Sequence, residues 1–303
     1  MLGIIIIDEQ HRFGVNQRLS LRSKNIETAL MPHQLTLTAT PIPRTMAMSV
    51  YANMDISIID ELPPGRLPIQ TTSLGMKKKD QLIGRIKEAC LKGSQVYWVC
   101  ALIEESELMN ANPVEETYEQ ITKQIPSIEC SFLHGKMKSD EKLNTINKFK
   151  NGDTQIMVST TVIEVGVDVP DADIMIIENA ERFGLAQLHQ LRGRIGRGKK
   201  QSHCILLHNE SIGEIAFQRM DILKESTDGF YIAEQDLMIR GPGEIMGSQQ
   251  TGVIPFKYTD LMRDSSYLEE TKVIAEKIYK EDKINSEKLI QRWLSGSIEF
   301  ADA

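Results

Sequence analysis

Residues 4–11 read IIIIDEQH, in which four consecutive isoleucines lead directly into two carboxylates. A solidly apolar run of this length is typical of a strand that is covered on both faces, as in parallel sheets. A carboxylate at the end of such a strand can hold a Mg²⁺ that bridges nucleotide phosphates, and its neighbour can orient or deprotonate the attacking water. We assign these roles to Asp8 and Glu9, and expect Gln10 and His11 to couple the site to a neighbouring element. A plain acidic strand end is the alternative.

The rest of the chain alternates short apolar runs with longer amphipathic ones, which predicts a parallel sheet flanked by helices. Two helical patterns are clear: residues 77–93, ending at Gly93, and residues 139–152, capped by Ser139 and stopped by Gly152. The predicted strands cover residues 3–8, 35–39, 95–102, 129–133, 155–159, 173–178 and 203–207.

The clearest boundary is ELPPGRLP, residues 61–68, where three prolines and one glycine exclude a continuous helix or a central strand. Too few strands precede this segment for a complete doubly wound domain, whereas enough follow it. From residue 211 onward the pattern is helical, interrupted by a glycine-rich patch. We expect a truncated first domain, a linker, a complete α/β domain and a helical appendix, at residues 1–62, 63–68, 69–210 and 211–303.

The composition of the 303 residues, 41% hydrophobic and 25% charged, is that of a soluble globular protein. No apolar run approaches the roughly 20 residues that cross a bilayer. Four cysteines without a CxxC pair favour a reduced, cytoplasmic setting over a zinc site or a disulfide framework. The net charge of −7 gives no global sign of nucleic-acid binding, but residues 192–200, RGRIGRGKK, hold five cations and no acid. A solvated loop is the simplest interpretation of that run.

A second motif, LTLTATPIPR at residues 35–44, ends a strand in small hydroxylated residues before two prolines force an extended turn. Hydrogen bonds from Thr38 and Thr40 could transmit the state of a phosphate site. A strand, turn and helix without such a role is the alternative.

A third motif, MVSTTVIEVGVDVP at residues 157–170, places two threonines at a strand end. The hydroxyl and backbone N–H groups of Thr160 and Thr161 suit a sugar-phosphate backbone. Gly166 and Asp168 lie on the predicted turn that follows, where they could sense a nucleotide.

The fourth motif is QLHQLRGRIGRG at residues 187–198. Gln190, Arg194 and Arg197 recur at four- and three-residue spacing, which predicts that they lie near one helical face. Arginine's fixed fork of donors suits phosphate oxygens, and an arginine supplied across a domain cleft stabilises charge that develops during phosphoryl transfer. A basic helix without a ligand is the alternative.

In this order, the motifs resemble those of superfamily 2 helicases and translocases, whose two RecA-like domains hold ATP between them. DEQH looks like their motif II, TATPIPR like motif III, STTVIEVGVD like motif V and QLRGRIGR like motif VI. DISIIDELPPGR, VYWVCALIEESE, LHGKMKSDEK and ENAERFGLAQLHQLRGRIGRG are similar to the RecG family of fork-remodelling DNA translocases. DLMIRGPGEIMGSQQTG resembles that family's translocation motif, which implies that Arg240 and Gln250 couple nucleotide state to movement on duplex DNA.

The resemblance implies an α/β fold with a RecA-like parallel sheet flanked by helices, one truncated and one complete motor domain, and a C-terminal helical appendix. It implies ATP and Mg²⁺ as cofactors and double-stranded or branched DNA, such as forks and Holliday junctions, as partners in repair and recombination. Asp8, Glu9, Arg194 and Arg197 would be catalytic. The resemblance favours a cytoplasmic monomer that contacts no membrane.

The 303 residues contain no GxxxxGK[ST] phosphate-binding loop, although the family carries one before motif II. We therefore expect this chain to lack autonomous ATPase activity, with a separately encoded N-terminal half as one possible source of the loop. Two alternatives are a non-catalytic DNA-binding or interaction remnant and a relative of the transcription-repair coupling factor. IDELPPGR, Gln10 and the proline of RGPGE favour the RecG family over the latter. A primosomal helicase is disfavoured because the sequence has no cysteine cluster.

Overall fold

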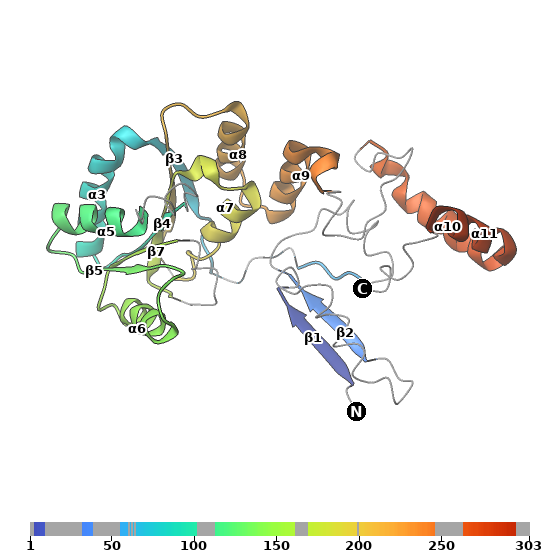
Figure 1. The fold of residues 1–303 in the computed structure, drawn as a ribbon, viewed down its shortest axis with the longest axis horizontal. Coiled ribbons are helices and arrows are strands. Elements are labelled where there is room, and N and C mark those ends of the chain that lie inside the picture. The colour runs from blue at the N-terminus through green and yellow to red at the C-terminus, as the bar shows by residue number, and fades with distance from the viewer. Residues whose placement is uncertain are drawn as a thin grey trace. The chain divides into compact units, whose positions relative to one another are not determined.

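The computed structural model describes residues 3–9, 32–38, 55–59, 61, 63, 65–101, 113–160, 169–198, 200–245 and 263–294. The chain divides into two compact units, of which one is Ser57–Asp236 and the other combines Met1–Ile56 with Leu237–Ala303. Each unit is described by itself (Figure 1). The boundaries expected at residues 62, 68 and 210 remain predictions.

The unit Ser57–Asp236 is built around a six-stranded sheet with the strand order β3-β8-β7-β4-β6-β5. Every neighbouring pair is parallel, and every residue of the central strands β4, β6 and β7 is buried. This confirms the predicted α/β fold, because strands covered on both faces read as continuous apolar runs. The strands are β3 (Gln70–Gly75), β4 (Gln95–Cys100), β5 (Cys130–Leu133), β6 (Ile156–Ser159), β7 (Ala172–Glu178) and β8 (His203–His208).

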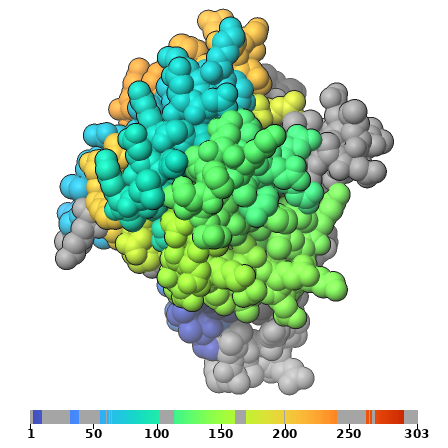
Figure 2. Space-filling view, turned by 90° about the vertical axis from the view of Figure 1, so that its left-hand side faces the viewer, coloured from blue at the N-terminus to red at the C-terminus, as the bar shows by residue number. Residues whose placement is uncertain are grey.

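Helices cover both faces of this sheet. On one face, Ile83 and Ile121 pack with Trp98 in a continuous hydrophobic core. On the other face, Phe149 lies with its ring centroid 4.9 Å from that of Tyr97. Figure 2 shows the molecule from the left-hand side of Figure 1, where the cyan surface of α3 adjoins the green surface of α5. The helices are α3 (Lys79–Leu91), α5 (Pro113–Gln124), α6 (Ser139–Lys150), α7 (Leu185–Arg192) and α8 (Glu214–Glu225), with the short 3₁₀ helices η3 (Met76–Lys78) and η5 (Ala180–Arg182).

Two local features of this unit differ from the sequence predictions. The strand β3 was not predicted, because its sequence QTTSLG is mostly polar; it is an edge strand that pairs only with β8 among the described strands. Helix α6 begins at Ser139, so this serine is the first helical residue and not the cap. The preceding backbone N–H, that of Lys138, donates instead to the Glu141 carboxylate at 3.4 Å.

In the other unit, β1 (Ile4–Asp8) and β2 (His33–Leu37) form a two-stranded parallel sheet. Burial alternates along β1, since Ile5 and Ile7 are buried whereas Ile4 and Ile6 are exposed. Among the described residues one face of this strand is thus exposed, which differs from the cover on both faces that is typical of a solidly apolar run.

Among the described residues, three α-helices and one 3₁₀ helix belong wholly or partly to the residues from Leu237 onward. Helix α9 (Gly229–Ile245) crosses the division between the units, and η6 (Ser265–Tyr267) precedes α10 (Leu268–Glu281). Helices α10 and α11 (Lys283–Leu294) are joined by the hydroxyl of Ser286, which donates to Ile278 O at 3.1 Å and Asp282 O at 2.9 Å. Within the described part of the chain, none of the helices combines the length and apolar character that a membrane span requires.

Candidate functional site

The acidic end of β1 places two carboxylates on consecutive residues at a sharp turn. The strand ends at Asp8, and Glu9 follows with a φ of 54°, in the left-handed region that non-glycine residues rarely adopt. The Glu9 N–H donates to Asp8 Oδ1 at 2.9 Å, so the aspartate stabilises the turn. Strained backbone of this kind clusters at functional sites, and the role of this pair remains a prediction.

The ends of β1 and β2 meet at the same edge of their sheet. Asp8 pairs in register with Leu37, and Thr38 comes directly after it. The structure therefore brings Asp8, Glu9 and Thr38 to one edge, as expected for parallel strands. Three other residues predicted for this region, Gln10, His11 and Thr40, lie outside the described residues.

The end of β6 carries two buried hydroxyls. Ser159 is 0% exposed and Thr160 is 3% exposed, and neither side-chain oxygen has a hydrogen-bond partner among the residues described. The Thr160 N–H donates to Leu133 O at 3.2 Å, so this backbone donor is already used within the sheet. Its role in DNA contact remains a prediction. Thr161, Gly166 and Asp168 lie outside the described residues.

The arginines of the fourth motif lie on a turn and not on a helix. Helix α7 ends at Arg192, and Gly196 has a φ of +78° that turns the chain again. Gln190 is therefore helical, whereas Arg194 and Arg197 belong to the turn. The prediction of one shared helical face is wrong, because α7 ends at Arg192 with Gly193 as its C-cap, before Arg194 and Arg197 are reached. The side chains of Gln190 and Arg194 are half-buried and that of Arg197 is exposed.

Arg192 has a structural role that composition did not reveal. Its side chain is 2% exposed and donates to two backbone carbonyls at the end of α8, Leu223 O at 2.7 Å and Ser226 O at 2.8 Å. Helix carboxyl ends favour cations, which offsets part of the cost of burying this charge. Burial lowers the pKa of the Arg192 guanidinium. The stretch from Arg192 to Lys200 is thus not a uniformly solvated basic loop, because its first cation ties α7 to α8.

Arg66, in the predicted linker, is a second residue that sequence reasoning missed. Its Nε donates to Gly196 O at 3.0 Å, and another guanidinium nitrogen donates to Ile195 O at 3.1 Å and Gly193 O at 3.4 Å. These three carbonyls belong to the turn that carries Arg194 and Arg197. The contact spans about 130 positions along the chain, so no local pattern could have indicated it.

A buried acid also closes the carboxyl edge of the large sheet. Glu178, at the end of β7, accepts hydrogen bonds from Trp98 Nε1 and Lys79 Nζ, each at 2.7 Å, and from the Thr117 hydroxyl at 3.4 Å. Lys79 also lies 5.7 Å from the centroid of the Trp98 ring. All three partners of Glu178 are buried or nearly so. The cluster therefore holds the carboxyl ends of β4 and β7 in place.

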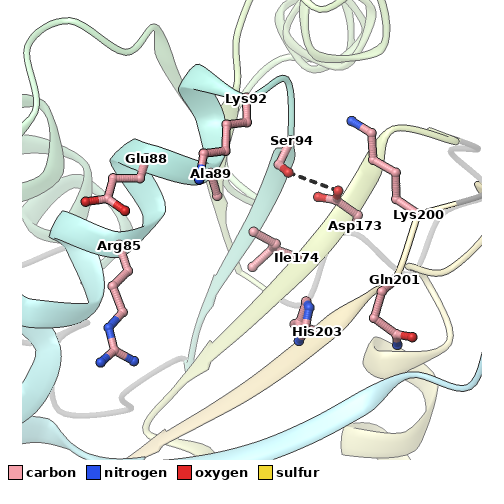
Figure 3. A pocket seen from close by; sticks show the side chains of 10 residues that line it. All are labelled: Arg85, Glu88, Ala89, Lys92, Ser94, Asp173, Ile174, Lys200, Gln201 and His203. Carbon is pink, nitrogen blue, oxygen red and sulfur yellow. Dashed lines mark hydrogen bonds between the residues drawn. The ribbon is translucent and has the colours of Figure 1, made fainter.

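A shallow cavity of about 350 Å³ lies at the opposite edge, where α3 faces the amino ends of β4, β7 and β8 (Figure 3). At its floor the Ser94 hydroxyl donates to Asp173 Oδ2 at 3.0 Å, and burial raises the pKa of the Asp173 carboxyl. The predicted nucleotide and DNA residues lie on other segments. Its lining residues are Arg85, Glu88, Ala89, Lys92, Ser94, Asp173, Ile174, Lys200, Gln201 and His203.

Comparisons with known proteins agree with the motifs and the fold. A family profile described as "Helicase conserved C-terminal domain" matches residues 77–199, and one described as "ATP-dependent DNA helicase RecG, domain 3, C-terminal" matches residues 226–292. The ATP-dependent DNA helicase RecG of Escherichia coli (strain K12) is 49% identical over 303 residues, which are 100% of this chain and 44% of that protein. The RecG of Haemophilus influenzae is 48% identical over the same span.

Solved structures show the same relationship. The structure of a RecG bound to a three-way DNA junction aligns with a TM-score of 0.66 at 42% identity, covering 88% of this chain and 34% of that one. The helicase Lhr of Mycobacterium smegmatis shares the fold alone, with a TM-score of 0.53 at 18% identity, covering 72% of this chain and 31% of that one. The chain thus spans less than half the length of the RecG proteins that it matches. Over its whole length this chain is thus similar to part of the ATP-dependent DNA helicase RecG, including the region at residues 226–292 that the RecG domain 3 profile matches.

Proposed function

We propose that this chain supplies the second motor domain, the magnesium-binding strand and the translocation segment of an ATP-dependent translocase on double-stranded DNA. Its substrates would be stalled forks and Holliday junctions in DNA repair and recombination. The observation that carries the proposal is the turn of Arg194 and Arg197, which Arg66 holds from the linker side through three carbonyls. Two arginines on a braced turn suit a charge that develops during phosphoryl transfer.

The donor groups present fit ATP and Mg²⁺. Asp8 would hold the metal, since carboxylate oxygen is the ligand that Mg²⁺ prefers, and Glu9 would orient the attacking water. Arg194 and Arg197 would contact the phosphates through their planar forks. When bound, the metal neutralises charge on the phosphate oxygens. Gln10, His11, Thr38, Thr40, Gly166, Asp168 and Gln190 would sense or transmit the state of the nucleotide.

The DNA-directed residues are proposed on the family relationship and on their positions. Thr160 and Thr161 follow β6 at the carboxyl edge of the sheet, and Arg240 lies within α9. Gln250 belongs to residues 226–292, which match the RecG domain 3 profile. A cytoplasmic setting is supported by the four cysteines, all of which are free thiols.

A non-catalytic DNA-binding or interaction role is the second candidate, and one observation favours it. Residues 194–200, RIGRGKK, hold four cations and no acid, a local charge that suits the phosphates of DNA. Binding of this kind would rest on phosphate contacts, so its affinity for duplex DNA should fall steeply as salt increases.

ATP hydrolysis in the presence of forked DNA tests the first proposal. The chain by itself should hydrolyse ATP no faster than its Asp8→Ala variant. In a chimera that joins the preceding residues of the E. coli relative to Met1, DNA-stimulated hydrolysis should appear. It should fall by about 100-fold or more in Arg197→Ala. A chimera that binds forked DNA without hydrolysing ATP would favour the non-catalytic role.

A further inference from the structure

The exit of the linker and the arginine turn are joined along several consecutive residues. Beyond the three bonds from Arg66, the Gln201 side chain donates to Pro68 O at 2.6 Å. One step further, the Gln70 N–H donates to Ser202 O at 3.0 Å, just before β3 pairs with β8. These bonds form one seam, which joins residues 66–70 to residues 193–196 and 201–202. A displacement of the linker exit must carry the arginine turn with it or break these bonds.

Side-chain packing at Gly196 adds to the hydrogen bonds of the seam. Gly196 has a φ of +78°, and a Cβ placed there would lie 3.1 Å from Ile69 Cγ1 and 3.3 Å from Ile69 Cδ1. The Ile69 side chain, just after the linker, therefore packs directly on the backbone of the turn. A larger residue at position 196 would have to push Ile69 away.

The charges show why an arginine is suited to this position. The Arg66 guanidinium is half-buried, and its pKa is lowered first by burial and second by the nearby positive charge of Arg197. Two like charges side by side are unfavourable, and the carbonyls of the turn offset that cost on the Arg66 side. The planar guanidinium of arginine can donate hydrogen bonds to three carbonyls of one turn at once. A lysine ammonium, in contrast, is a point charge on a flexible side chain.

We propose that Arg66 is a positioning residue, which couples the conformation of the inter-domain linker to the placement of Arg194 and Arg197. The proposal rests on the function proposed above, because the arginine pair matters for catalysis only in a nucleotide-hydrolysing motor. Arg66 acts through the backbone of the turn and has no contact with substrate assigned to it. When the linker moves during the ATPase cycle, the arginine pair is then displaced with it.

The structural half of the proposal is tested on the 303-residue chain by amide hydrogen exchange. In Arg66→Ala, residues 193–198 should exchange about 10-fold faster, while the core strands β4 and β7 keep their protection. The matched control is Arg85→Ala, which removes an exposed arginine of α3 that takes no part in the bonds between residues 66–70 and the turn. Equal exchange of the turn in the two variants would overturn the proposal. Arg66→Lys should give an intermediate rate, because one ammonium replaces only part of the fork.

The functional half of the proposal is tested in the chimera described above. The kinetic constants distinguish a positioning role of Arg66 from a role in stability alone. Arg66→Ala should lower kcat for ATP about 10- to 100-fold with KM changed less than about 3-fold, because misplaced arginines affect the transition state more than binding. Arg66→Lys should recover part of kcat, and Arg85→Ala should match the unsubstituted chimera. A kcat for Arg66→Ala equal to that of Arg85→Ala would overturn the coupling. An inactive unsubstituted chimera would refute the proposed function, and the exchange measurement would still decide whether Arg66 holds the turn.

Discussion

His189 illustrates how a buried neutral residue supports the arginine motif. Its Nδ1 lies 3.1 Å from a guanidinium nitrogen of Arg192, and burial together with that cation lowers the pKa of His189 from 6.5 to about 4. Between these two values the unfolded chain binds a proton that the folded chain does not, so stability falls as pH falls from 6.5 toward 4. The imidazole therefore acts as a neutral acceptor at physiological pH.

We expect the free energy of unfolding to drop by at most about 3 kcal/mol over this pH range because of His189. His189→Gln retains an acceptor but does not titrate, so its stability should depend less on pH. Urea unfolding at a series of pH values between 4 and 7 measures the difference. Parallel stability curves for the two proteins would show that His189 does not carry this dependence.

Asp173 should give a pH dependence of the opposite sign. Burial raises the pKa of its carboxyl above 3.8, although the Ser94 hydroxyl bond counteracts the shift. The folded chain then binds a proton that the unfolded chain has lost, so stability falls as pH rises through this window. Asp173→Asn should remove that loss and match or exceed the parent in stability at pH 7. A marked destabilisation of Asp173→Asn at pH 7 would contradict this account.

At the scale of single elements, the turn after α7 depends on one glycine. Gly196→Ala should destabilise the protein by about 1–2 kcal/mol, because alanine is strained at a positive φ and its Cβ would press on Ile69. The matched control is Gly84→Ala in the middle of α3, where a Cβ would meet nothing within 4 Å. That change should stabilise by up to about 1 kcal/mol. Thermal unfolding of both variants measures the two changes in stability. Equal shifts of the same sign in Tm would contradict the dependence on Gly196.

The elements that sequence reasoning predicted are those whose signal is local. The buried strands β4, β6 and β7 are continuous apolar runs, and α3 and α6 have clear amphipathic patterns. The edge strand β3 escaped prediction because pairing on one side only allows a polar sequence.

The difference between local and tertiary signals also explains which residues of the candidate site could be predicted from the sequence. Strand-end residues such as Asp8 follow a recognisable pattern, whereas Arg66 and Arg192 reach acceptors that are remote in sequence. Their roles depend on tertiary contacts that neither spacing nor composition reports. The helix predicted through Arg194 is wrong for a local reason, since Gly193 is the C-cap of α7 and the arginine spacing was interpreted without it.

At the scale of the whole chain, the bare face of the β1–β2 sheet has a measurable consequence. Ile4 and Ile6 are 54% and 61% exposed, and Leu35 and Leu37 on β2 are 48% and 44% exposed. The register places Ile6 opposite Leu35, so these side chains form one apolar patch. Exposed apolar strands of this kind are templates for association.

The 303-residue chain by itself should therefore self-associate as its concentration rises, which sedimentation velocity can follow. Ile6→Lys should weaken the association about 10-fold or more, because a charge would have to be desolvated within the patch. The matched control is Leu143→Lys, which changes a leucine that is 60% exposed on α6 and should leave association unchanged. Equal effects of the two substitutions would exclude the patch as the contact. In the chimera the preceding residues should cover this sheet, and the predicted monomer is expected there.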